Sequence, residues 1–139
     1  MKKLKKAKLI IIYSLICFLF FHIKIFNISN IKICICTIGK QENRYIREFT
    51  EYYKNYGIDQ IFLYDNNDVK GERFEEVISD FINSGFIKLY NWRGKRSPQL
   101  KILRHCYKNN YNKFDWLIFY DIDEYINLKN YTNIKDFLN

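Results

Sequence analysis

Two hydrophobic patterns alternate along the chain from residue 31 to its end. Short runs of β-branched and aromatic residues are typical of buried strands, whereas apolar residues every three or four positions are typical of helices packed on one face. The patterns predict strands over 31–38, 60–64, 86–92 and 116–120, and helices over 43–56, 72–83 and 98–110 and from 132 onwards. Ser97 is predicted to cap the third helix. Because helices join successive strands, we expect an α/β fold with a mostly parallel sheet flanked by helices.

Polar or charged residues follow each predicted strand. These segments are Thr37–Glu42, Asp65–Asp68, Arg93–Arg96 and Asp121–Glu124. The carboxyl ends of parallel strands lie at one edge of a sheet, and ligands of such sheets bind there. We therefore expect three acidic or polar loops and one basic loop to meet at a single rim.

The first 28 residues follow a different pattern, in which five lysines within the first eight residues precede the apolar run 9–21. A membrane-spanning helix needs about 20 apolar residues and a signal-peptide core about 7–15. Because no small-x-small cleavage site follows, we expect a hydrophobic helix that acts as an uncleaved signal anchor, giving a single-pass membrane protein with its N-terminus in the cytoplasm. The alternatives are a cleaved signal that leaves a secreted or peripheral protein, and a buried helix of a larger assembly.

Composition limits the remaining possibilities. With 139 residues, 48% of them hydrophobic and 19% aromatic, the chain has room for one domain with a core, and global disorder is excluded. We divide it into an anchor or signal segment, 1–28, and a globular part, 29–139. The net charge of +8 owes much to the lysines near the N-terminus, so it does not indicate a nucleic-acid partner.

Several residues with chemical potential are expected to be structural. The four cysteines do not form a C-x-x-C metal motif and are too few for a disulfide scaffold. Cys34 and Cys36 share one face of a predicted strand, so we expect them to pack in the core rather than bind a ligand. We expect the same of Trp92 and Trp116, and we expect His105 to be a satisfied or partly exposed helical side chain.

Asp121 and Asp123 directly follow a strongly apolar predicted strand. Carboxylates placed there can hold Mg²⁺ or Mn²⁺ and leave coordination positions for phosphate oxygens. The basic loop, with Arg93, Lys95 and Arg96, could neutralise a diphosphate on the same rim. The alternatives are a strand-ending turn with solvated carboxylates and a solvated basic loop.

Five sequence blocks together resemble glycosyltransferase family 92 and the related family-2-like transferases. They are Cys36–Asn43, Glu51–Gly57, Ile61–Asn67, Gln99–Cys106 and Trp116–Ile126. The resemblance implies a GT-A fold and a metal-dependent glycosyltransferase that moves a sugar from a nucleotide-sugar donor to a hydroxyl of a glycan or other acceptor. The implied cofactor is Mn²⁺ or Mg²⁺.

The resemblance also assigns expected roles to individual residues. Asp121 and Asp123 match the family's Asp-x-Asp metal motif, in which the first carboxylate usually faces the donor's sugar or ribose. It also implies nucleotide-sugar contacts by Thr37, Glu42, Asp65 and Gln99, and we expect Arg96 to join them because of its place in the basic loop. No catalytic residue is assigned.

Two departures from the family pattern affect this interpretation. Lys40-Gln41-Glu42 replaces the usual Lys-Asn-Glu. Only fifteen residues follow Glu124, whereas such enzymes place the acceptor site and, in inverting members, the catalytic base well beyond the Asp-x-Asp. We therefore expect the globular part to be the donor-binding half of a truncated transferase. The alternatives are a non-catalytic donor-binding remnant and a haloacid-dehalogenase-like phosphatase with a nucleophilic aspartate. The phosphatase is disfavoured because Tyr125 stands where that motif has Thr or Val.

Overall fold

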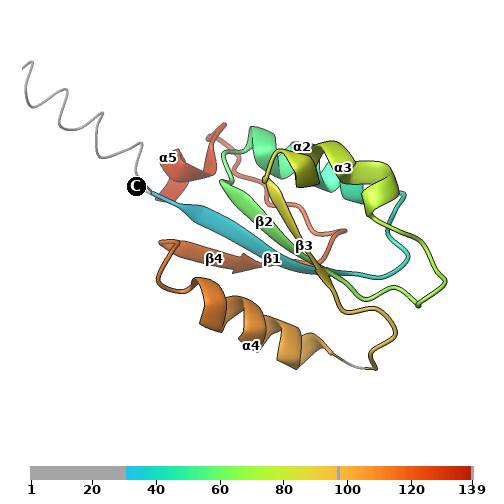
Figure 1. Ribbon diagram of the computed structural model, residues 1–139. Coiled ribbons are helices and arrows are strands. Elements are labelled where there is room, and N and C mark those ends of the chain that lie inside the picture. Colours follow the sequence, from blue (N-terminus) through green and yellow to red (C-terminus); the bar gives the residue numbers. More distant parts are fainter. Residues whose placement is uncertain (1–30, 97, 139) are drawn as a thin grey trace, which may run out of the picture.

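The computed structural model describes residues 31–96 and 98–138, which form one parallel sheet with helices on both faces (Figure 1). The strands are β1 (Ile33–Gly39), β2 (Gln60–Asp65), β3 (Ile87–Asn91) and β4 (Trp116–Phe119), and the helices are α2 (Ile46–Asn55), α3 (Glu75–Asn83), α4 (Gln99–Asn110) and α5 (Ile134–Leu138). The strand order is β3-β2-β1-β4, and every neighbouring pair is parallel. The predicted α/β fold is therefore confirmed.

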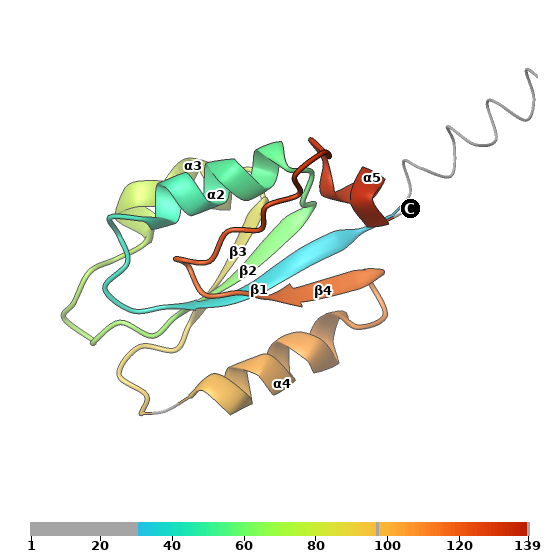
Figure 2. The same ribbon diagram turned by 180° about the vertical axis from the view of Figure 1, so that it is seen from behind.

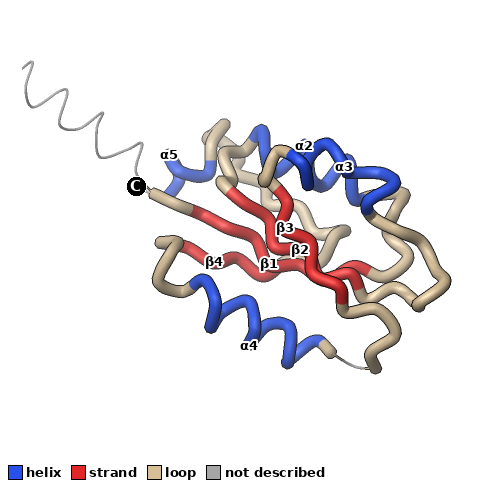
Figure 3. Tube along the Cα trace, in the orientation of Figure 1, coloured by secondary structure: helices blue, strands red, loops and turns tan. Residues whose placement is uncertain are grey.

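The helices are divided between the two faces of the sheet. Helices α2 and α3 cover one face and α4 covers the other, as the two opposite views show (Figures 1 and 2). The loops that join them to the strands extend beyond the ends of the sheet (Figure 3). Strand β1 lies between β2 and β4 and is almost entirely buried, which explains its continuous apolar sequence.

Alternate residues of β1 supply two separate hydrophobic clusters. Ile33 and Ile35 belong to the larger cluster with residues of α2 and α3, such as Phe49 and Phe81. The smaller cluster lies beneath α4 and consists of Cys34, Cys36, Phe62, Tyr64, Ile102 and Cys106. This division follows from the two-residue period of a strand, and it fixes which β1 side chains can face each helix layer.

Helices α2 and α3 begin at Ile46 and Glu75, three residues later than their patterns predict. The residues before the two helices form hydrogen bonds with each other instead of starting a helix. The backbone N–H of Asn43 donates to Glu72 Oε2 at 3.1 Å, and Asn43 Nδ2 donates to the carbonyl of Arg73 at 3.1 Å. Pro98 occupies the N-cap position of α4. The predicted capping residue, Ser97, lies outside the described residues.

The prediction of a hydrophobic N-terminal helix also falls on residues outside those described. Within 31–96 and 98–138, no helix is both long and apolar enough to cross a membrane.

The structure adds to the cysteine prediction. Cys34 and Cys36 are buried as expected, but Cys36 also forms a disulfide with Cys106, which joins β1 to α4 across 70 positions of sequence. Cys34 remains a free thiol. The spacing of the cysteines did not indicate the pairing, because it depends on α4 returning across β1.

The expectation for Trp116 was wrong, whereas those for Trp92 and His105 are confirmed. Trp116 is 48% exposed because it begins β4, an edge strand. Trp92 packs against the smaller cluster. His105 Nδ1 lies 2.8 Å from Tyr64 Oη, within hydrogen-bond distance, and its ring also meets the rings of Tyr90 and Trp92 edge-on.

Candidate functional site

The loops after β1, β2 and β3 are bonded to one another at the carboxyl edge of the sheet. Asn67 is fully buried, and its Oδ1 accepts the backbone N–H of Gln41 at 2.6 Å. The carbonyl of Asn67 accepts the N–H of Gly94 at 2.9 Å, and the N–H of Asn66 donates to Gly39 at 2.9 Å. The predicted convergence of these loops is confirmed, and Asn67 is the residue that joins all three.

Asp65 takes part in this loop network through both carboxylate oxygens. Oδ2 pairs with Arg93 Nη1 at 2.6 Å, with side chains only 3% and 11% exposed, and Oδ1 accepts the N–H of Asn67 at 2.9 Å. Arg93 Nη2 also donates to the carbonyls of Asp68 and Gly71. In the structure, Asp65 and Arg93 therefore hold the loops in place, and a nucleotide contact by Asp65 remains a prediction.

The Asp-x-Asp segment forms a tight turn after β4. The N–H of Asp121 donates to Glu124 Oε2 and the N–H of Glu124 donates to the carbonyl of Asp121, each at 3.1 Å. Ile122 is buried in the larger cluster, whereas Asp121 and Asp123 are exposed. Burial of the central isoleucine therefore anchors the turn and leaves both carboxylates in solvent.

A second set of bonds fixes the chain just after this turn. The buried Tyr53 hydroxyl of α2 donates to the carbonyl of Glu124 at 3.0 Å and accepts the N–H of Ile126 at 3.1 Å. The hydroxyl of Tyr52 donates to the carbonyl of Ile126. We did not predict these contacts, because the helical pattern identifies Tyr52 and Tyr53 as apolar-face residues without showing what their hydroxyls reach.

A cleft of about 340 Å³ lies beside the turn. Its lining residues are Ile38, Lys40, Glu42, Asn66, Pro98, Gln99 and Asp121. An adjoining depression of about 250 Å³ shares Ile38, Gln99 and Asp121 with it and extends to Glu124. The cleft therefore brings together three of the predicted site residues, Glu42, Gln99 and Asp121, from three different parts of the chain.

Thr37 and Arg96 are placed differently from these three residues. Thr37 is 1% exposed, and its Oγ1 has no hydrogen-bond partner among the described residues. The alternation of β1 directs Thr37 toward the α2 and α3 layer, whereas Ile38 faces the cleft. Arg96 is exposed in the loop after β3. Lys40, Asn66 and Pro98 also line the cleft, although we did not predict them as site residues. Lys40 directly follows β1, Asn66 directly follows β2 and Pro98 directly precedes α4, and these positions could have indicated that they lie at the rim.

Negative charge accumulates at one side of the cleft. The pKa of Glu42 is raised, first by its partial burial and then by the charges of Asp123, Glu72 and Asp121. The three carboxylates of Glu42, Asp121 and Asp123, here called the acidic triad, therefore lie within electrostatic reach of one another. A bound cation would relieve their repulsion.

The carboxylate oxygens of the acidic triad are the type of ligand that Mg²⁺ and Mn²⁺ prefer, so the triad suits a divalent cation. Across residues 31–96 and 98–138, no three His, Cys, Asp or Glu side chains already form a compact metal-ligating group. A cation would therefore take part of its coordination from water or a phosphate-bearing ligand, as Mg²⁺ commonly does.

Replacing Glu42 with glutamine is expected to raise stability modestly at pH 7.5, by less than about 1 kcal/mol because water screens this partly exposed group. A raised folded-state pKa means that the native state holds the proton more strongly, so the wild type loses stability as pH rises from the unfolded value through the folded one. Urea denaturation should show the gain at pH 7.5 and no gain below about pH 3, where glutamate is protonated in both states. A glutamine variant less stable than the wild type at pH 7.5 would contradict this account.

Comparison with known proteins gives the family of the chain. Residues 29–139 match the family model described as Glycosyltransferase family 92. The chain is 29% identical over 106 residues to a glycosyltransferase family 92 protein of Oryza sativa subsp. japonica, an alignment covering 76% of this chain and 18% of that protein. The corresponding values are 27% over 106 residues for one from Ricinus communis, covering 76% and 19%, and 26% over 96 residues for one from Arabidopsis thaliana, covering 68% and 16%.

The chain belongs to glycosyltransferase family 92. Its aligned part spans less than a fifth of the length of these curated relatives. No solved structure is significantly similar to the chain.

Proposed function

We propose that this chain binds a nucleotide-sugar and serves the transfer of its sugar to a hydroxyl of a glycan or other acceptor. The observation that carries the proposal is the cleft at the carboxyl edge of the parallel sheet, where Glu42, Gln99 and Asp121 meet. This edge is where α/β sheets bind ligands. Family membership favours a transferase over a phosphatase for the Asp-x-Asp turn.

The cleft combines groups that suit anionic phosphate oxygens with carboxylates that would meet the phosphates through a bound cation. Helix α4 begins at Gln99, and the first turn of a helix presents free N–H groups and a partial positive charge that suit phosphate oxygens. Asn66 and Lys40 line the same cleft, although Lys40 Nζ also pairs with Asp68 at 3.0 Å. The diphosphate is thus proposed to lie between the start of α4 and the acidic triad.

Asp121 and Asp123 are proposed to hold Mn²⁺ or Mg²⁺, with Glu42 close enough to contribute negative charge. When bound, such a cation supplies charge stabilisation to the departing nucleoside diphosphate. The carboxylates of the chain provide the negative field that attracts the cation, and Ile122 keeps them at the edge of the cleft. Residues 29–139 are then the donor-binding part of the protein.

Residues 1–28 are proposed to anchor the protein in a membrane, with 29–139 on the non-cytoplasmic side. The Cys36–Cys106 disulfide supports this orientation, because disulfides persist in oxidising compartments and are rare in the cytosol.

Calorimetric titration of the full chain in detergent micelles with nucleoside diphosphates, with Mn²⁺ and with EDTA, tests the donor site. We expect Mn²⁺-dependent binding that Asp123→Ala weakens at least about tenfold, because one lost charge-assisted contact costs about 1.4 kcal/mol or more. Asp136→Ala is the matched control, since Asp136 is also an exposed carboxylate but belongs to α5.

Binding that is indifferent to Mn²⁺ and to Asp123, or no binding to a folded chain, would contradict the proposed donor site. Binding without sugar release in the presence of hydroxyl acceptors would retain the donor site and identify this chain as a binding unit that does not complete transfer by itself.

A further inference from the structure

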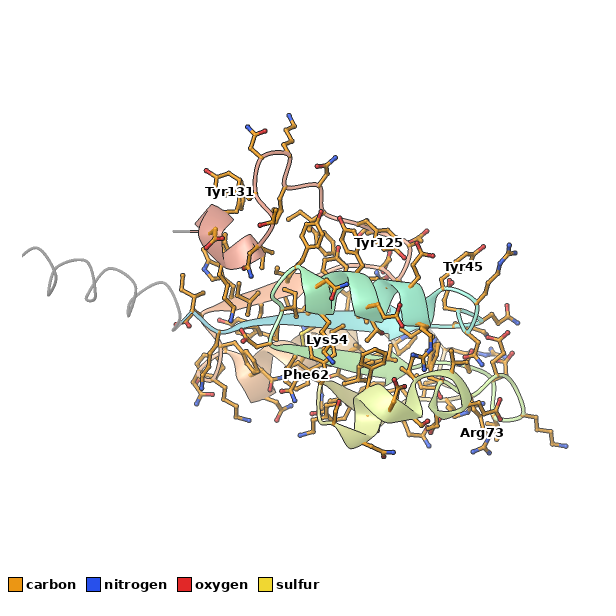
Figure 4. The ribbon with its side chains drawn as sticks, turned by 90° about the horizontal axis from the view of Figure 1, so that it is seen from above. Tyr45, Lys54, Phe62, Arg73, Tyr125 and Tyr131 are labelled. Atoms are coloured by element: carbon orange, nitrogen blue, oxygen red, sulfur yellow. A yellow bond between two sulfur atoms is a disulfide. The ribbon has the colours of Figure 1, made fainter. Side chains whose placement is uncertain are left out.

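A second cleft, here called the basic cleft, lies at the amino edge of the sheet, where the strands begin. It has a volume of about 420 Å³, and its lining residues are Lys32, Asp59, Gln60, Phe62, Lys88, Asn110, Lys113 and Phe114. Lys32 precedes β1, Gln60 begins β2 and Asn110 ends α4, so the basic cleft is on the face that α4 covers (Figure 1). Figure 4 shows Phe62 nearer the start of β1 and Tyr45 toward the other end of the sheet.

The three lysines of the basic cleft have no carboxylate partner among the described residues. Lys32, Lys88 and Lys113 are exposed and belong to none of the ion pairs within 31–96 and 98–138. The carboxylate in the lining, that of Asp59, is already engaged, because Oδ1 pairs with Lys135 Nζ at 2.6 Å and Oδ2 accepts the first N–H of β1 at 2.7 Å. The basic cleft therefore carries a net positive charge that the described residues do not neutralise.

The floor of the basic cleft is apolar. Phe62 is buried, Phe114 is half-buried, and their rings meet edge-on with centroids 5.6 Å apart. Asp115 follows Phe114, but its Oδ2 accepts the backbone N–H of Lys32 at 2.7 Å. Lysine ammonium groups suit phosphate oxygens as point charges, and phenylalanine rings suit hydrocarbon. An anionic phospholipid headgroup presents both kinds of surface, because its phosphate is joined to glycerol carbons.

The place of the basic cleft in the sequence brings it close to the proposed membrane anchor. Lys32 follows residue 28, the end of that segment, by four positions, which an extended chain spans in about 14 Å at most. Surface charges act over about 8 Å at physiological ionic strength, and the long lysine side chains extend toward the lipid. The amino edge of the sheet would thus be held near the headgroups by the length of the connection.

We propose that the basic cleft docks the globular part on the membrane by receiving the phosphate of an anionic phospholipid. The inference rests on the membrane anchor of the proposed function and extends it, because it fixes how residues 29–139 are oriented on the bilayer. Strand β1 has seven residues, so the carboxyl edge with the acidic triad faces away from the lipid, about 20 Å farther out.

The two tryptophans of the chain provide reporters at the two edges. Trp116 begins β4, is 48% exposed, and donates its backbone N–H to the carbonyl of Lys32 at 3.2 Å. Trp92 directly follows β3, at the carboxyl edge. A nitroxide on a lipid headgroup quenches tryptophan fluorescence only at short range, so the quenching reports which edge faces the lipid.

The experiment reconstitutes the full chain in vesicles of phosphatidylcholine, or of phosphatidylcholine mixed equally with phosphatidylglycerol, each with a nitroxide-headgroup lipid in both leaflets. We expect stronger quenching in the mixed vesicles, and high salt should remove the difference. Lys88→Glu/Lys113→Glu should also lose it, because each lysine contributes roughly fivefold to binding an anionic surface. Trp116→Phe should lose it because the reporter is gone.

Lys70→Glu/Lys101→Glu is the matched control and should keep the lipid-dependent quenching. Both lysines are exposed, and they lie in the loop after β2 and in the first turn of α4, away from the amino edge. The charge change is the same as in the test variant. The salt dependence of the wild type tests the same point without any substitution.

The outcomes separate the docking from the anchor on which it rests. A wild type that resists alkaline carbonate extraction but is quenched equally in both lipids would overturn the docking and leave the anchor standing. An unchanged lipid dependence in Lys88→Glu/Lys113→Glu would do the same. A wild type that carbonate removes from the vesicles would overturn the anchor and this inference with it, while the nucleotide site is judged separately by its own titration.

Discussion

Loss of the Cys36–Cys106 disulfide is expected to lower the free energy of unfolding by about 4 kcal/mol. The bond closes a loop of 70 positions, and the chain-entropy relation assigns about that stabilisation to a loop of this length. Domains of this size are stable by only about 5–15 kcal/mol, so the disulfide accounts for a large share of the total. It also fixes α4 over β1, so its loss should loosen the start of α4 at the cleft.

Urea denaturation of Cys106→Ser and of the wild type, each with and without dithiothreitol, checks this expectation. Reduction should shift the wild-type midpoint to that of the variant and should leave the variant unchanged. Cys34→Ser is the control, because it removes the free thiol but keeps the disulfide, so its midpoint should still shift when dithiothreitol is added. Burial raises the pKa of Cys34 to about 12, so its thiol stays protonated and resists alkylation at neutral pH. Equal midpoints for the oxidised wild type and Cys106→Ser would refute the assigned contribution.

Substituting alanine for Gly39 is expected to destabilise the fold by about 1–3 kcal/mol, the usual cost of overpacking a core. A Cβ at this position would lie 2.4 Å from Phe74 Cζ and 2.7 Å from Ile122 Cδ1. Both side chains are buried, so neither can swing aside into solvent. The displacement of Ile122 should also move the turn that carries Asp121 and Asp123.

Gly39→Ala can therefore be followed by two measurements in the presence of Mn²⁺. The denaturation midpoint should fall, and the Kd of a nucleoside diphosphate should rise. Gly71→Ala is the control, because the nearest atom to its Cβ would be the Asp68 carbonyl oxygen, 3.3 Å away, and it should therefore cost less stability than Gly39→Ala. A Gly39→Ala protein with wild-type stability would show that Phe74 and Ile122 repack without cost.

The parts of the structure that depend on local pattern were predictable from the sequence. The periodicity of apolar residues identified all four strands, and the rule for parallel sheets placed Glu42 and Asp121 at one rim, whereas Gln99 was expected there only from the family resemblance. The remainder depends on pairings between distant residues. Nothing in the sequence around Asp65 distinguishes a ligand contact from its buried ion pair with Arg93, 28 positions away.

The same limitation explains the cysteine and tryptophan results. The Cys36–Cys106 bond requires knowing which strand α4 covers, and the exposure of Trp116 requires knowing that β4 is at the edge of the sheet. An apolar run looks alike in an edge strand and in a central one, because periodicity reports the faces of a strand and not its neighbours.

The strand order has a consequence for how the chain assembles during synthesis. Strand β1 can pair with β2 once β2 has been synthesised, but the other edge of β1 must wait for β4, whose Trp116 pairs with Ile33. Such distant pairing slows folding and leaves an open strand edge in the meantime. Cys106 is made before β4, so oxidation can fix α4 over β1 at an earlier stage. The bond would then preserve a partly built sheet while its last strand is still being added.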